Sequence, residues 1–186
     1  MNDSVQITPE ERLHALADNL REQFGDRGCE INLALGEITM QLPRDQLLEI
    51  ATQLHDDEQF QFTQVIDICG MDYADYGKSE WVTKDASASG FGRGVTKSGL
   101  QAGESGADRF AVVYHLLSPS LNHRVRLRVF VQTEHPIVDS VIGIWNSSDW
   151  FEREAFDMYG ILFKGHPDLR RILTDYGFVV HPLRKD

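Results

Sequence analysis

The chain has 186 residues, of which 41% are hydrophobic and 25% charged, values typical of one ordinary globular domain. Its 29 acidic and 18 basic residues give a net charge of -11, which would repel a phosphate backbone and argues against nucleic acid as a partner. It contains no run of about 18 apolar residues, and its N-terminus carries acidic residues where an export signal would carry basic ones. We therefore expect neither a membrane span nor an export signal.

The opening part of the chain predicts a helix, a hairpin and a second helix. The first helix starts at Thr8 and Pro9, with Glu11 completing a capping box. Two short strands are expected at 29–35 and 38–42. The apolar stripe of the second helix consists of Leu47, Leu48, Ile50, Ala51 and Leu54.

Three further strands are expected. A strand over 62–69 ends before a glycine, and residues 109–117 and 124–131 form the clearest hairpin. In the second strand of this hairpin, apolar residues alternate with arginines, so the two sets face opposite sides of the sheet. The arginine row consists of Arg124, Arg126 and Arg128. It could be a docking surface for a partner. We favour the alternative that carboxylates of the same domain neutralise it.

Residues 78–107 differ in composition from the rest of the chain, being rich in Gly, Ser, Ala and Lys with almost no large apolar residue. Such a stretch cannot offset its ordering entropy by burial, so it predicts a mobile surface loop inserted between strands. Its glycine-rich part, 90–94, neither follows a strand nor opens a helix, which argues against a dinucleotide-binding loop.

The order of these elements predicts the fold class. Helices and strands are mixed without a regular strand–helix alternation, which favours an α+β fold with a mixed or mainly antiparallel sheet flanked by helices. We expect an α+β domain over 1–148, which includes the inserted loop, and a second unit over 149–186 made of one helix and an extended C-terminal arm.

The two cysteines, Cys29 and Cys69, lie far apart and in no paired spacing. An iron–sulfur cluster usually needs four thiolates, and a structural zinc site would have to recruit scattered histidines for which no spacing argues. We therefore expect two buried, reduced thiols in a cytosolic compartment.

Residues 149–160 predict an amphipathic helix, with Asp149 as its cap and Gly160 as its stop. On the exposed side, Arg153 and Asp157 stand one turn apart and can pair. The charged residues of that side are Glu152, Arg153, Glu154 and Asp157.

Beyond this helix come two histidine–proline turns, at 166–167 and 181–182, each leading into basic residues. Proline keeps the preceding residue out of the α region, so the expected product is an extended, irregular and positively charged arm. Its apolar residues need a surface to bury them, and a partner protein is a natural one; they are Leu169, Ile172, Leu173 and Phe178.

Residues 152–161 have the sequence EREAFDMYGI, and the chain continues with His166, Arg170, Ile172 and Leu173. In this order they resemble the signature of the 30 kDa subunit family of respiratory complex I, the proton-translocating NADH:quinone oxidoreductase. The resemblance extends to FAVVYHLLS at 110–118, to 147–150 and to the closing HPLRKD. Two departures concern the arm: two valines precede the second histidine–proline turn where the family commonly has an acidic residue and glycine, and relatives usually continue beyond the last residue.

The resemblance implies a cofactor-free structural subunit in the peripheral arm of complex I. Its partners would be the subunit that forms much of the quinone pocket and the neighbouring iron–sulfur subunits, and FMN and the iron–sulfur clusters would lie in those partner chains. The protein would support electron transfer from NADH to quinone without catalytic residues of its own. It would associate with a bacterial inner membrane only through the complex, on the cytoplasmic side.

Because they match the family motif, seven residues are our candidates for the partner interface: Glu152, Arg153, Glu154, Asp157, His166, Arg170 and Arg171. They would form desolvated, hydrogen-bonded pairs within the subunit or across to the quinone-pocket subunit. The simpler hypothesis is that they only cap and solvate a helix.

Two alternatives stay open at this point. Glu154 and Asp157, with His166 as a base, could form a metal-dependent hydrolase site, although no activated nucleophile or further ligand motif accompanies them. The scaffold could instead serve a related assembly, such as a membrane-bound hydrogenase or a ferredoxin- or coenzyme-linked oxidoreductase.

Overall fold

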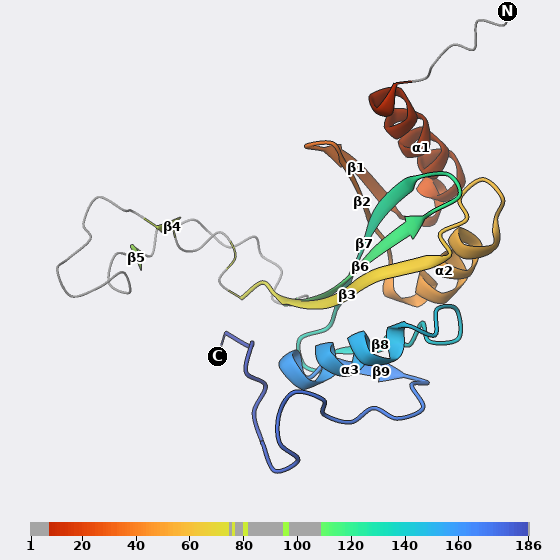
Figure 1. Ribbon diagram of the computed structural model, residues 1–186. Coiled ribbons are helices and arrows are strands. Elements are labelled where there is room, and N and C mark those ends of the chain that lie inside the picture. Colours follow the sequence, from red (N-terminus) through yellow and green to blue (C-terminus); the bar gives the residue numbers. More distant parts are fainter. Residues whose placement is uncertain (1–7, 75, 77–79, 82–94, 97–108, 186) are drawn as a thin grey trace, which may run out of the picture.

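A computed structural model describes residues 8–74, 76, 80–81, 95–96 and 109–185. Its main element is a five-stranded sheet with the strand order β1-β2-β7-β6-β3 (Figure 1). Neighbouring strands are antiparallel except β2 and β7, which run parallel. The predicted α+β class with a mixed sheet is therefore confirmed. The strands are β1 Glu30–Ala34, β2 Glu37–Gln41, β3 Gln64–Asp72, β6 Phe110–Ser118 and β7 His123–Val131.

The predicted helix, hairpin and helix of the opening part are confirmed. They are α1 (Pro9–Phe24), the β1–β2 hairpin and α2 (Leu47–Asp56), with 3-10 turns at Gly25–Arg27 and Arg44–Gln46. The capping box at the start of α1 is present: the Thr8 hydroxyl accepts the Glu11 N–H at 3.2 Å, and the Glu11 carboxylate accepts the Thr8 N–H at 2.7 Å. The sequence alone predicts this helix start because the cap is a local contact.

The hydrophobic core lies on one face of the sheet, under α1 and α2, and continues to α3 (Ser148–Tyr159) beside the β3 edge (Figure 1). The expected apolar row of β7 is buried there: Val125, Leu127, Val129 and Val131. One cluster of buried residues includes members from both predicted units, from Leu16 to Phe163. The division at 148 and 149 stays a prediction.

The arginine row of β7 lies on the opposite face of the sheet and is partly neutralised by its own domain. Arg126 forms an ion pair with Glu37 on β2 at 2.5 Å. Arg128 donates instead to the amide oxygen of Gln41 at 3.0 Å. The interpretation that carboxylates of the same domain neutralise the arginine row is thus confirmed for Arg126.

The sequence did not predict the short parallel pair of β8 (Ile137–Asp139) and β9 (Leu162–Lys164), which lies next to α3. Three-residue strands carry too little periodicity to be detected. Of the predicted loop 78–107, the structure describes β4 (Glu80–Trp81) and β5 (Val95–Thr96), which pair antiparallel. The rest of that prediction lies outside the described residues.

The expectation of two buried thiols is correct for Cys29 and wrong for Cys69, which is half-buried; both thiols are free. Cys69 is the neighbour of the buried Ile68 on β3 and therefore points away from the core.

Candidate functional site: helix α3 and the C-terminal arm

The N-cap of helix α3 lies two residues earlier than its sequence suggests. Ser147 occupies the N-cap without a side-chain hydrogen bond, so the prediction of Asp149 as the cap is wrong. The helix ends at Gly160 as predicted, in the left-handed conformation (φ 73°) that glycine adopts without steric cost.

The charged residues of α3 were expected on an exposed face, and for three of the four this is wrong. Glu152 and Asp157 are 0% exposed and Arg153 is 9% exposed, whereas Glu154 is exposed. For Arg153 and Asp157 the reason is that the chain after α3 folds back along this side of the helix, as Figure 1 shows for the segment that leads to the C-terminus, whereas Glu152 is covered by the chain that leaves β8. A pattern local to the helix contains no information about such a return.

Asp157 is the main anchor of the returning arm. One carboxylate oxygen accepts the backbone N–H groups of Ile172, Leu173 and Thr174 at 3.0, 2.8 and 2.8 Å. The other accepts the Thr174 hydroxyl at 2.5 Å and the Arg171 guanidinium at 2.7 Å. Burial alone would raise the pKa of Asp157, but the hydrogen bonds from Thr174, Leu173 and Ile172 outweigh it and hold that pKa far below its usual range.

Arg153 holds the same arm one turn earlier on the helix. Its guanidinium donates to the carbonyl oxygens of Arg170 and Arg171 at 3.1 and 3.2 Å. The predicted pair between Arg153 and Asp157 is not formed, because Arg171 takes the carboxylate instead. The arm is thus fixed by a buried cation and a buried anion, each bonded to it separately.

Arg171 links this anchor to the following turn, since it also donates to the Val180 carbonyl oxygen at 3.1 Å and lies over the Phe178 ring at 5.9 Å. Arg170 differs, because it stays exposed and pairs with Asp168 at 2.7 Å. Of the two predicted arginines in the arm, Arg171 and not Arg170 places its side chain in the buried network.

The His166 side chain is buried at the start of the arm. Its Nδ1 accepts the Asp168 N–H at 3.1 Å, so Nε2 carries the proton and donates to the Asp149 carbonyl oxygen at 3.2 Å. His166 therefore joins the turn after β9 to the first turn of α3.

Glu152 binds a different segment. Its carboxylate accepts the Ser140 hydroxyl at 2.5 Å and the Val141 N–H at 2.8 Å, which fixes the chain that leaves β8. Burial raises the pKa of Glu152 to about 7, against the lowering effect of these two hydrogen bonds. The nearby Tyr114 hydroxyl is also buried and has no hydrogen-bond partner among the described residues.

Sequence reasoning missed the residues that hold the end of the arm. His181 Nδ1 lies 2.9 Å from the Asp157 carbonyl oxygen, and Arg184 donates to the Tyr159 carbonyl oxygen at 2.6 Å. A Cβ at Gly160 would meet these two side chains at 2.6 and 2.5 Å, so the glycine also allows the close approach. The sequence indicates this segment through its histidine–proline turn at 181–182 and through the family resemblance of HPLRKD, but neither predicts these contacts.

The arm exposes apolar side chains on its outer side. Leu169 packs against the core and Ile172 is half-buried, so these two find their burial within the chain. Others remain on the surface: Leu173, Tyr176, Phe178, Val179, Val180 and Leu183 are 63%, 82%, 43%, 88%, 60% and 50% exposed. We call this set the apolar surface of the arm.

The hydrolase alternative does not fit this geometry. Asp157 uses both oxygens to bind the arm, and His166 is turned toward Asp149. Within the described ranges, one group of three His, Cys, Asp or Glu ligand atoms lies close enough to hold a metal ion; it comprises Asp67, Cys69 and His115 and includes none of the predicted residues.

Comparison with known proteins identifies the family. Residues 40–186 match the family model described as the respiratory-chain NADH dehydrogenase 30 kDa subunit. The chain belongs to this complex I family. The predicted resemblance is thereby confirmed.

Relatives in this family are named as a subunit of NADH-quinone oxidoreductase. The protein of Legionella pneumophila (strain Corby) is 50% identical over 171 residues, which are 92% of this chain and 75% of the relative. That of Hydrogenovibrio crunogenus is 51% identical over 175 residues, 92% of this chain and 78% of the relative. Membership of a multi-subunit NADH-quinone oxidoreductase follows.

Two solved structures share the fold. The trypsin-resistant fragment (1–134) of Nqo5 is 30% identical, with a TM-score of 0.57, and the match covers 85% of this chain and 99% of the fragment. A chain of the archaeal membrane-bound sulfane sulfur reductase has a TM-score of 0.64 over 92% of this chain and 83% of that chain, but at 15% identity it supports the fold alone. None of the helices in the described part of this family member has the length and apolarity needed to span a bilayer.

Proposed function

We propose that the chain is a non-catalytic, cofactor-free structural subunit in the peripheral arm of a proton-pumping NADH:quinone oxidoreductase. It docks to the quinone-pocket subunit and to neighbouring iron–sulfur subunits. FMN and the iron–sulfur clusters lie in those partners and carry electrons from NADH to quinone. The assembly holds this subunit at the cytoplasmic side of a bacterial inner membrane.

One observation carries this proposal: the arm presents its apolar surface outward while a buried polar network holds its backbone in a defined course. A loose tail would have to be ordered upon binding, at a cost in conformational entropy. An arm already fixed by Asp157 and Arg153 avoids part of that cost. Exposed apolar side chains that are rigidly held are suited to a permanent protein interface.

The seven candidate interface residues divide into two roles under this proposal. Glu152, Arg153, Asp157, His166 and Arg171 act within the subunit, because their polar atoms are bonded to its own backbone and side chains. Glu154 and Arg170 are exposed and remain available to a partner. The motif thus shapes the interface more than it touches the neighbouring chain.

A pull-down of the tagged full chain from solubilised membranes tests the docking. In the variant Val179→Asp a charge enters the apolar surface of the arm, and we expect recovery of the quinone-pocket subunit to fall at least tenfold. Leu35→Asp is the matched control, because Leu35 is an exposed apolar residue on the turn between β1 and β2, away from the arm, and should leave recovery unchanged. Equal recovery with both variants would reject the arm as the docking surface.

The variant Arg153→Ala tests the role of the buried network in the same experiment. It leaves the two carbonyl oxygens of the arm without their donor, so recovery should fall although no exposed residue has changed.

The flavin- and cluster-containing chains that co-purify with the wild type identify the electron donor. Recovery of hydrogenase or coenzyme-linked input chains would favour the related assembly over complex I.

A further inference from the structure

A group of potential metal ligands lies on the sheet face opposite the core, and none of its members takes part in the contacts that hold the arm. Asp67 and Cys69 are two residues apart on β3, so both point to the same side of the sheet. His115 on β6 stands directly opposite Asp67 in the antiparallel register. Their ligand atoms all lie within 4.8 Å of one another, and all three residues are half-buried.

The register of β3 contributes to this arrangement. The pairing of β3 with β6 is irregular between Val65 and Asp67, which are matched to the consecutive residues Leu116 and His115. Without this extra residue the carboxylate would not stand opposite the imidazole. Bulges of this kind re-aim side chains and are frequent beside functional sites.

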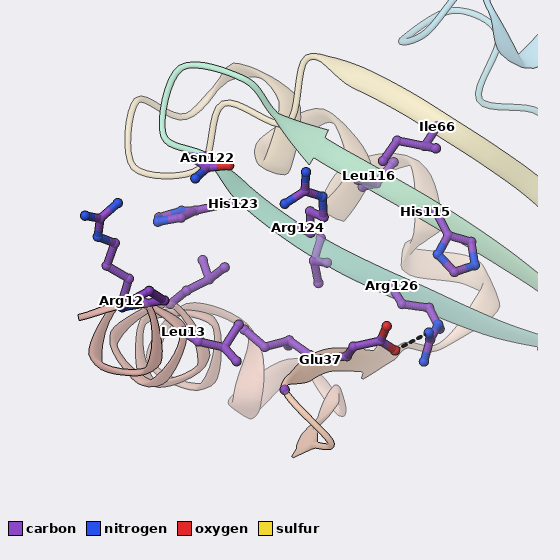
Figure 2. Close-up of a pocket in the computed structure, with 15 residues that line it drawn as sticks. Arg12, Leu13, Glu37, Ile66, His115, Leu116, Asn122, His123, Arg124 and Arg126 are labelled. Carbon is purple, nitrogen blue, oxygen red and sulfur yellow. Dashed lines mark hydrogen bonds and ion pairs between the residues drawn. The ribbon is translucent and has the colours of Figure 1, made fainter. Parts of the chain in front are cut away.

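The three side chains are also not engaged elsewhere. Among the described residues, no hydrogen bond or ion pair joins the side chain of Asp67, Cys69 or His115 to one another or to a neighbour. The nearest competitor on the adjacent strand is Arg126, opposite His115, but its guanidinium is bound to Glu37 and Thr39. Figure 2 shows Arg126 joined to Glu37, with the His115 ring beside it.

The electrostatic environment favours a cation at this point. Burial, followed by the carboxylate of Asp67, raises the pKa of the Cys69 thiol; Glu154 acts in the same direction and Arg126 opposes it. Two carboxylates, those of Asp67 and Glu154, thus act on the thiol together with one guanidinium, that of Arg126. A divalent cation would compensate them and stabilise the thiolate.

We propose that Asp67, Cys69 and His115 bind a divalent cation of the zinc class. One sulfur, one imidazole nitrogen and one carboxylate oxygen form a mixed set that suits Zn²⁺ or Co²⁺ better than Mg²⁺ or Ca²⁺, which prefer oxygen alone. At bond lengths of about 2.0 to 2.3 Å, the ligand atoms of a tetrahedral ion lie about 3.3 to 3.8 Å apart. The observed separations of up to 4.8 Å would have to shorten by about 1 Å on binding.

Three protein ligands leave the fourth position of a tetrahedral ion open, and solvent fills it in the isolated chain. The hydrophobic core forms on the other face of the sheet and does not include these residues. Binding should therefore occur on the folded chain without driving its folding, unlike a closed four-ligand structural site.

Titration of the purified, reduced full chain with Co²⁺ alone tests the site, because a thiolate bound to Co²⁺ gives an intense near-ultraviolet charge-transfer band. We expect this band at one equivalent of metal and its loss on addition of Zn²⁺, which competes for the same ligands. Absence of the band in the wild type, or Co²⁺ binding without it, would overturn the proposal.

Two variants assign the ligands. Cys69→Ser should abolish the band, and His115→Ala should weaken Co²⁺ binding by about tenfold or more, since even outer-shell changes cost 10- to 100-fold. Cys29→Ser is the matched control: this buried cysteine is not part of the ligand group and its loss should leave the band intact. A band that survives Cys69→Ser contradicts the assignment, and an unchanged circular dichroism spectrum of each variant shows that its fold is intact.

Discussion

The carboxylate of Asp157 on α3 and the guanidinium of Arg171 in the arm form an ion pair at 2.7 Å in which the Asp157 side chain is 0% and the Arg171 side chain 14% exposed. The same carboxylate binds three consecutive backbone N–H groups of the arm. A single residue of the family motif therefore binds the arm at four consecutive positions, residues 171–174.

We predict that Asp157→Asn detaches the arm. The amide cannot accept hydrogen bonds at both positions and leaves Arg171 without its counter-charge, at a cost of about 3 to 5 kcal/mol for a buried pair. The expected result is rapid hydrogen exchange at the amides of 172–174 and protease cleavage after residue 162, measured by mass spectrometry. Full protection in the variant would show that the carboxylate is not the anchor.

Asp168→Asn is the control for this prediction. Asp168 pairs with Arg170 at 2.7 Å, but both side chains are more than half exposed, so the pair is worth about 0 to 1 kcal/mol. Exchange in 172–174 should stay as in the wild type. The two substitutions remove the same charge from the same region and differ in the burial of the carboxylate.

A second prediction concerns Glu152, which is 0% exposed and has its pKa raised from 4.5 to about 7. Between these values the folded state holds a proton that the unfolded state releases, so the free energy of unfolding falls as the pH rises. The loss approaches about 3 kcal/mol and is complete above about pH 7. Glu152→Gln keeps a neutral side chain of the same shape at every pH.

Urea unfolding of wild type and Glu152→Gln at about pH 5 and about pH 8 measures this effect, since these values lie on either side of the raised pKa. The stability of the variant relative to the wild type should rise between the two values, because only the wild type has to ionise its buried carboxyl. Parallel changes in both proteins would mean that Glu152 does not titrate in this range.

The sequence predicted the fold where the determinants are local. The capping box of Thr8 and Glu11, the alternation in β7 and the glycine that ends α3 each act within a few residues, and each is confirmed. The parallel pairing of β2 with β7 depends on residues far apart in the chain, such as Thr39 and Arg126, and no local pattern contains it.

The same distinction explains the errors at the candidate site. Arg153 and Asp157 satisfy the helical rule for a surface ion pair, but each finds better partners in a segment 14 to 18 residues later. The ligand group of Asp67, Cys69 and His115 was missed because a spacing search looks for cysteines and histidines close in sequence. Strand alternation at Asp67 and Cys69 was the available signal, and it needed the register with β6 to complete it.

The third prediction tests the packing of α3 on β3. At Gly70 a Cβ would lie 2.5 Å from the ring of Tyr159, so the strand approaches the helix only because it lacks a side chain there. Gly70→Ala should lower the free energy of unfolding by about 1 to 3 kcal/mol through overpacking.

Gly143→Ala is the matched control, since nothing lies within 4 Å of its Cβ and the change in the free energy of unfolding should be within about 0.5 kcal/mol. Chemical denaturation of both variants measures the difference, and an equal stability would show that Tyr159 moves aside freely. Because the Tyr159 carbonyl oxygen also accepts the hydrogen bond from Arg184, a displaced Tyr159 should in addition increase exchange at the end of the arm.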